Sequence, residues 1–167
     1  MMQPSISTIL SLTDIFDNLT ETQLQLVAAI CDPFTYQKGQ LLFREHENST
    51  DMYVIGRGGV EIMMNPGVVG THEESLTVDP VVIAEIRQGQ VLGEVALVDQ
   101  GIRSATARAS RDDTVVLRLS RERLMRLCDM YPELGYKLMR NLAADLALKI
   151  RQTDLTLRQY QLMLSGR

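Results

Sequence analysis

A change of pattern near residue 120 restricts the fold more than any other feature of this sequence. Between Phe34 and Leu119, short apolar segments alternate with glycine-containing turns, whereas the stretch between Gly135 and Ser165 contains no Gly or Pro. Short strands with turn signals at this density are typical of a sandwich, a jelly roll or a small barrel. The uninterrupted stretch after Gly135 is typical of a long helix. We therefore predict that the chain of 167 residues forms one β domain followed by C-terminal helices.

The β region contains five clear apolar segments. We predict strands at residues 41–43, 52–55, 60–64, 81–86 and 114–119, with a hairpin turn over residues 56–59. The segment between Met64 and Val81 contains two prolines and two glycines, which predicts a long surface loop between two strands. Its role stays open between a tolerated insertion and a contact with a partner.

A short helix is predicted before the β region. Thr20 and Gln23 form a capping box, and apolar residues at helical spacing follow as far as Cys31. Because the residue before a proline is disfavoured in a helix, Pro33 is expected to end this element. The chain thus divides into an N-terminal helical segment (1–33), a β region (34–119) and a C-terminal helical segment (120–167).

Two helices are predicted in the C-terminal segment. Ser120 is expected to cap the first, which ends near Met130, and Pro132 opens the second, which runs to about Leu164. A helix of roughly 30 residues is about 45 Å long, more than a small β domain can cover. Its apolar stripe is therefore expected to pack against a second copy of the chain, although folding back on its own domain is an alternative. The predicted dimer seam is Leu142, Leu146, Ile150, Thr153, Leu157, Tyr160 and Leu164.

The composition disfavours several classes of protein. With 17 basic and 21 acidic residues the net charge is −4, which argues against a large nucleic-acid footprint on this chain. No apolar run approaches the roughly 20 residues of a membrane span, and the N-terminus lacks the basic cluster of a secretory signal. Cys31 and Cys128 are expected to be buried free thiols in helical stretches, and two histidines are too few for a metal site. We therefore expect a cytoplasmic protein without metal, cofactor or membrane span.

The segment from Gly89 to Ala109 is the most informative for chemistry. Residues 93–97 can leave a strand and begin a helical turn, and small residues there let backbone amides approach an anion. Nine residues after Glu94 comes Arg103, whose guanidinium offers a fork of donors suited to a phosphate. A carboxylate for hydroxyl groups, a guanidinium and free amides together suit a sugar phosphate. The Glu and Arg taken alone would more often form a surface ion pair.

The whole pattern resembles the phosphate-binding cassette of the cyclic-nucleotide-binding domain family, which includes catabolite-activator-like and protein-kinase-A-regulatory-subunit-like sensor domains. The family motif reads roughly F-G-E-[LIV]-A-L and then P-R-[AST]-A-[TS]; here residues 92–97 read L-G-E-V-A-L and residues 102–106 read I-R-S-A-T. The likeness extends from about Ile15 to Leu142. It implies a mainly β fold, an eight-stranded jelly roll (a cupin-like double-stranded β-helix) with an N-terminal helix and two C-terminal helices.

The resemblance also implies roles for residues of the cassette, at about 89–109. Glu94 would accept the ribose 2′-hydroxyl, Gly93 would let the backbone pass close to the sugar, and the amide of Ala96 would meet the cyclic phosphate. Arg103 would pair with the charged phosphate oxygen, and Ser104 would lie beside the phosphate and the base. The predicted ligand-binding residues are Leu92, Gly93, Glu94, Val95, Ala96, Arg103, Ser104 and Ala105.

Three positions depart from the family pattern. Ile102 stands in place of Pro, and Leu92 in place of Phe; we expect both to be apolar packing positions. His46 stands where Gly is usual, and a positive φ is costly without glycine, so a different turn is expected there.

The resemblance implies a homodimeric, non-enzymatic sensor in which a cyclic nucleotide moves the C-terminal helices. We expect cAMP to be favoured over cGMP. The base would be touched by residues 141–153 of a partner subunit. The chain could act as a stand-alone receptor on a separate effector, or be the sensor fragment of a catabolite-activator-type transcription regulator. An interaction module of the same fold that binds no nucleotide is a further alternative. A metal-dependent cupin enzyme is disfavoured, because it needs inward His and carboxylate ligands, and both histidines are predicted in loops.

Overall fold

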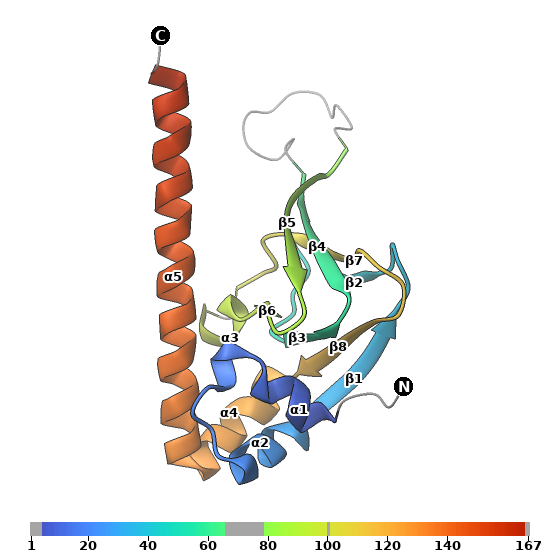
Figure 1. Cartoon of the computed structure of the whole chain (residues 1–167), viewed down its shortest axis with the longest axis vertical. Helices are drawn as coiled ribbons and strands as arrows, with labels where there is room; N and C mark the ends of the chain where they lie inside the picture. The colour runs from blue at the N-terminus through green and yellow to red at the C-terminus, as the bar shows by residue number, and fades with distance from the viewer. Residues whose placement is uncertain (1–4, 66–78, 100, 166–167) are drawn as a thin grey trace.

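The computed structural model describes residues 5–65, 79–99 and 101–165 (Figure 1). Eight strands form two antiparallel sheets of four. The first sheet has the order β1 (Cys31–Tyr36), β8 (Thr114–Leu119), β3 (Met52–Arg57) and β6 (Val91–Leu92); the second has the order β2 (Leu41–Phe43), β7 (Thr106–Ala109), β4 (Gly59–Met64) and β5 (Val81–Arg87). The predicted eight-stranded, mainly β fold with flanking helices is confirmed.

Helices lie on both sides of the β region in the chain. Before it come α1 (Ile6–Ser11), a 3-10 turn η1 (Asp14–Phe16) and α2 (Glu21–Ala28). A short helix α3 (Val95–Asp99) follows β6, and α4 (Arg121–Met130) and α5 (Pro132–Ser165) follow β8. The predicted capping box at Thr20 and Gln23 is present in both directions, at 3.0 and 3.2 Å. The predicted boundaries of α4 and α5 are also close to those observed.

Strand β3 is buried on both of its faces, and this explains its continuous apolar run. Its Tyr53 and Ile55 join a cluster between the two sheets, while Met52 and Val54 join a larger cluster between the first sheet and the helices. Successive side chains of a strand point to opposite faces, so one strand serves both cores. The first sheet is therefore the central layer, with the second sheet on one side and the helices on the other.

The start of the β region differs from the prediction. Helix α2 ends at Ala28, and β1 begins at Cys31, so the β region starts at 31 rather than 34. Cys31 is thus buried in a strand and not in a helix, with its Sγ donating to the carbonyl oxygen of Val27 at 3.3 Å. Pro33 lies inside β1 and does not precede it. An edge strand tolerates a proline, and β1 is at the edge of its sheet.

Two turns also differ locally. The predicted hairpin over residues 56–59 is wrong, because β3 ends at Arg57 in the first sheet and β4 begins at Gly59 in the second, and the two strands do not pair. The chain crosses between the sheets at Gly58, where φ is +83° and a Cβ would collide with Thr114. Ser120 precedes α4 as predicted, but its side chain makes no capping hydrogen bond. The predicted loop between Met64 and Val81 falls mostly on residues 66–78, which lie outside the described residues.

Helix α5 is packed in its first half and exposed in its second. Leu134, Leu138 and Leu142 are buried, and Leu146 packs partly against the same cluster. From Ile150 to Ser165 every residue is exposed, and Figure 1 shows this half of α5 standing apart from the sheets. Leu142 therefore belongs to the domain core, and its place in the predicted dimer seam is wrong. The exposed part of that seam is Ile150, Thr153, Leu157, Tyr160 and Leu164.

Candidate functional site

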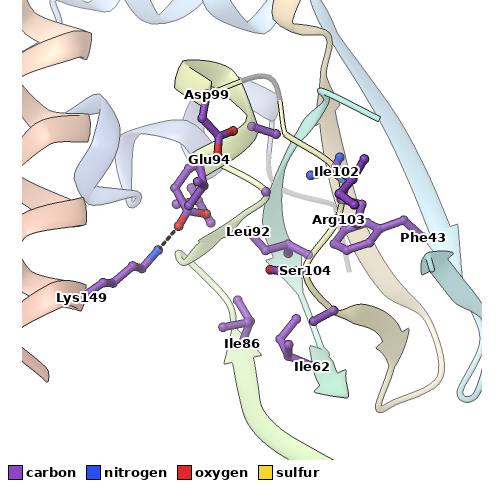
Figure 2. Close-up of a pocket in the computed structure, with 15 residues that line it drawn as sticks. Phe43, Ile62, Ile86, Leu92, Glu94, Asp99, Ile102, Arg103, Ser104 and Lys149 are labelled. Carbon is purple, nitrogen blue, oxygen red and sulfur yellow. Dashed lines mark hydrogen bonds and ion pairs between the residues drawn. The ribbon is translucent and has the colours of Figure 1, made fainter. Parts of the chain in front are cut away.

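A cavity of about 310 Å³ lies where β6, α3 and the segment before β7 meet the second sheet (Figure 2). All eight residues predicted to bind a ligand line it: Leu92, Gly93, Glu94, Val95, Ala96, Arg103, Ser104 and Ala105. The other lining residues are Phe43, Ile62, Ile86, Val91, Asp99, Ile102 and Lys149. The structure thus brings the whole predicted cassette to one site.

Gly93 makes the turn from β6 into α3 possible. Its φ is +75°, a left-handed conformation that favours glycine. A Cβ at this position would collide with Nη1 of Arg103 and would lie 2.8 Å from the carbonyl oxygen of Asp51. The absence of a side chain therefore lets the guanidinium lie directly against the cassette backbone.

The backbone at Arg103 is fixed by the turn after β2. The amide of His46 donates to the carbonyl oxygen of Arg103 at 2.8 Å, and the amide of Arg103 donates to the carbonyl oxygen of Glu47 at 3.0 Å. We expected a different turn at His46, but His46 itself adopts the positive φ, +66°. The left-handed conformation is thus kept without glycine, in a turn whose backbone takes part in this two-way pairing.

The Arg103 side chain is nearly fully buried, with 4% of the residue exposed. Its Nη2 donates to Oγ of Ser49 at 3.0 Å and to the carbonyl oxygen of Asp51. The guanidinium lies over the ring of Phe43, 4.3 Å from its centroid, and 5.6 Å from that of Tyr53. Its Nε is buried without a hydrogen-bond partner among the described residues. Burial lowers the pKa of Arg103, but an arginine stays protonated, so the site retains a cation with an unsatisfied donor.

Glu94 is the second charged group of the cavity, and it is paired. Its side chain is only 7% exposed, and Oε1 accepts from Nζ of Lys149 at 2.7 Å (Figure 2). Lys149 lies on α5 and also pairs with Asp145 at 2.9 Å. Burial alone would lower the pKa of Lys149, but its hydrogen bonds to Glu94 and Asp145 outweigh burial and raise it. The carboxylate therefore meets the cavity as one half of an ion pair.

The small residues of the cassette line the wall between these charges. Ala96 and Ala105 are buried, with 6% and 9% of each residue exposed, and Ser104 is exposed to the cavity. Leu92 is packed as predicted, with 4% exposed. Ile102 is 61% exposed, so the expectation that it is a packing position is wrong. Ile102 nevertheless lines the cavity, so it lies between the site and solvent.

Sequence reasoning missed most of the wall facing the cassette. Ile62 of β4 and Ile86 of β5 are partly buried and make the opposite side apolar. Alternation in those strands could have assigned them inward positions. No sequence signal could have found Lys149, because its approach depends on where α5 crosses the domain. Lys149 of this chain reaches the cavity, and the contact that we expect from residues 141–153 of a partner subunit stays a prediction.

Across residues 5–65, 79–99 and 101–165, no group of three or more His, Cys, Asp or Glu side chains is placed to hold a metal ion. Over the same residues, no helix is both long enough and apolar enough to span a membrane.

Residues 33–131, more than half of the chain, match the family model of the cyclic nucleotide-binding domain. The chain belongs to the cyclic nucleotide-binding domain family. Among its relatives in this family, the cyclic AMP receptor protein of Thermus thermophilus is 29% identical over 143 residues, which are 86% of this chain and 60% of that protein. Human cGMP-dependent protein kinase 2 is 26% identical over 117 residues, which are 70% of this chain and 14% of the kinase. The chain thus spans less than two thirds of the receptor protein and a small part of the kinase.

Solved structures of family members have the same fold. The Thermus thermophilus catabolite activator protein superposes with a TM-score of 0.72 at 28% identity, covering 89% of this chain and 63% of that one. A cyclic nucleotide-binding domain from Methylobacillus flagellatus gives a TM-score of 0.76 at 22% identity, covering 93% and 82%. The resemblance inferred from the cassette is therefore confirmed at the level of family and fold.

Proposed function

We propose that this chain is a receptor for a 3′,5′-cyclic purine nucleotide, with cAMP preferred over cGMP. Arg103 carries the proposal: this buried cation, whose Nε has no hydrogen-bond partner among the described residues, lines the same cavity as the carboxylate of Glu94. A buried donor without a partner is costly, and an anionic oxygen from a ligand would satisfy it. The cyclic phosphate supplies one negative charge, which one guanidinium can match.

The sugar and the base would occupy the rest of the cavity. The ribose 2′-hydroxyl would donate to Glu94, and the cassette backbone at Gly93 and Ala96 would lie against the sugar phosphate. Ile62 and Ile86 offer an apolar wall for a purine ring. The relatives include both a cyclic AMP receptor protein and cGMP-dependent kinases, so the preference for cAMP is the finer part of the proposal, and titration with both nucleotides decides it.

The proposed output is a movement of the C-terminal helices in a cytoplasmic homodimer that signals to an effector and has no catalytic activity, metal or cofactor of its own. Support for the dimer comes from the exposed half of α5, where Ile150, Leu157 and Tyr160 are between 56% and 63% exposed. Apolar stripes of this kind are usually covered by a partner. A second role, as the sensor part of a catabolite-activator-type regulator, is supported by the 28% identity to such a protein over 89% of this chain.

Titration calorimetry and thermal unfolding with cAMP, cGMP and 2′-deoxy-cAMP test the proposal. We expect saturable heat with cAMP, and a stabilisation that grows with concentration as RT ln(1 + [L]/Kd). Glu94→Gln should weaken cAMP binding and scarcely change 2′-deoxy-cAMP binding. No heat and no thermal shift with millimolar cAMP or cGMP would overturn the proposal, and the fold would then be an interaction module without a nucleotide.

A further inference from the structure

One contact joins the candidate site to the long C-terminal helix. Lys149 Nζ lies 2.7 Å from Oε1 of Glu94 in the cassette and 2.9 Å from Oδ2 of Asp145, one turn earlier on α5. The Glu94 side chain is 7% exposed, and that of Lys149 is 41% exposed. The pair therefore links residues far apart in the sequence at the edge of the cavity, partly shielded from water.

This contact lies where α5 leaves the domain. Before it, Leu142 is buried in the core and Leu146 packs on the core. After it, from Ile150 onward, every described residue is exposed. Within the part of the chain that the structure describes, the Lys149–Glu94 bond is the most C-terminal hydrogen bond from α5 to another element. The last hydrogen bond before the exposed half of α5 is thus made to the site.

Lys149 also balances the charge of the cavity. The cavity is lined by two anionic side chains, Glu94 and Asp99, and by two cationic side chains, Arg103 and Lys149. Without Lys149, two carboxylates would face a single guanidinium, and the field would oppose an anionic ligand. A buried carboxylate without a counter-charge would also be strongly disfavoured.

We infer that Lys149 is a positioning residue that makes Glu94 selective for a sugar hydroxyl and carries occupancy of the sugar site into α5. With one carboxylate oxygen held by Lys149, the other is free to accept a hydroxyl donor. A hydroxyl that donates to the other oxygen draws on the same negative charge, and so weakens the bond between Lys149 and Glu94 that joins α5 to the site. Such linkage is reciprocal, so the state of α5 also changes the affinity for the sugar. This inference rests on the proposed binding of a cyclic nucleotide.

The test compares Lys149→Met and Lys149→Arg with wild type, using cAMP and 2′-deoxy-cAMP in calorimetry. The matched control is Lys137→Met, a lysine on the same helix that pairs with Glu133 and Gln23 away from the cavity. In the wild type we expect cAMP to bind about tenfold or more tightly than the deoxy compound. Lys149→Met should reduce this ratio to about threefold or less, Lys149→Arg should restore most of it, and Lys137→Met should leave it unchanged.

Amide hydrogen exchange of residues 150–165 provides the second readout. Each protein is measured at a cAMP concentration that saturates it. Binding should change the amide exchange rates of this segment in the wild type and in Lys137→Met, but not in Lys149→Met. A double-mutant cycle should show that Lys149→Met has no further effect on the sugar ratio when Glu94 is already Gln.

The outcomes separate the two proposals. One outcome is that the wild type binds cAMP while Lys149→Met keeps the same sugar ratio and the same exchange response. That result would overturn the role of Lys149 and leave the receptor function standing. Loss of affinity for both sugars by the same factor, without rescue by Lys149→Arg, would also overturn it, because a merely structural role predicts that result. No binding by the wild type would overturn both proposals.

Discussion

Gly93 and Arg103 fit together because Gly93 has no side chain. A Cβ at Gly93 would enter the space of Nη1 of Arg103, and the guanidinium is held in that place by Ser49 and Asp51. The glycine of the cassette thus serves two purposes, since it supplies the left-handed backbone, with φ at +75°, and the room for the cation. The geometry of the candidate site therefore depends on a steric match between two residues of one motif.

Gly93→Ala should lower cAMP affinity at least about tenfold, or about 1.4 kcal/mol, because the new methyl group displaces Arg103. Gly39→Ala is the matched control: Gly39 has φ at +88°, and a Cβ there meets nothing within 4 Å. Both variants should lose roughly 1 kcal/mol of stability from backbone strain. Calorimetry should find the affinity of Gly39→Ala unchanged, and an equal loss in both would argue against the steric account.

Arg103→Ala should cost about 3 kcal/mol of binding free energy, a hundredfold or more in Kd, since a ligand phosphate would be left unpaired in a partly dry cavity. Arg103→Lys should not restore it, because one ammonium cannot hold Ser49 and Asp51 and also reach the ligand. Arg108→Lys is the control, since Arg108 pairs with Glu61 outside the cavity. Full recovery of affinity in Arg103→Lys would show that charge alone is needed.

His46→Gly should stabilise the protein by up to about 1 kcal/mol, because His46 adopts φ at +66° and glycine has no Cβ penalty there. For a chain of this size the gain corresponds to roughly 2–4 °C in Tm. Asn18→Gly, at φ +63°, should gain less because asparagine tolerates this conformation. Thermal unfolding measures both, and a destabilised His46→Gly would mean that the imidazole contributes contacts which outweigh its strain.

Asp32 should make stability depend on pH in the acid range. A hydrogen bond from Arg118 lowers the pKa of Asp32 below its usual 3.8, desolvation partly opposes this, and Arg123 lowers it further. A carboxyl group with a lowered pKa contributes stability that is present above the unfolded value and is lost as the pH falls through the folded value. Asp32→Asn should therefore cost less than about 1 kcal/mol at pH 7, as for exposed ion pairs, and progressively less below pH 3.8. Urea unfolding at several pH values measures this, and a constant difference down to pH 3 would contradict it.

Leu157→Glu should dissociate the proposed dimer, because it places like charges across a twofold seam. Leu155→Glu adds the same charge at a position that is similarly exposed, 59% against 56%, but off the predicted seam. Light scattering should give twice the chain mass of 18.8 kDa for the wild type and for Leu155→Glu, and the chain mass for Leu157→Glu. A wild-type mass near 18.8 kDa at tens of micromolar, with and without cAMP, would overturn the dimer.

The sequence by itself determined the class of fold and the location of the site. Turn residues and strand periods are local signals, so they predicted five of the eight described strands and the capping box of α2. The resemblance of the whole cassette to a known family, and not the spacing alone, placed Glu94 and Arg103 in one site. Local signals failed where an element's neighbours decide: Pro33 fits into β1 because that strand lies at a sheet edge, and Leu142 is buried because α5 lies against the core.

Only the tertiary structure decided how the charges of the site are held. Ser49 and Asp51 anchor Arg103 across 54 and 52 residues, and Lys149 reaches Glu94 across 55. Such contacts depend on how whole helices and strands pack, because this packing decides which side chains come within hydrogen-bond distance. Periodicity along the chain carries no information about these distances. The sequence therefore predicted the groups of the candidate site, while the fold alone supplied the connection from one of them to α5.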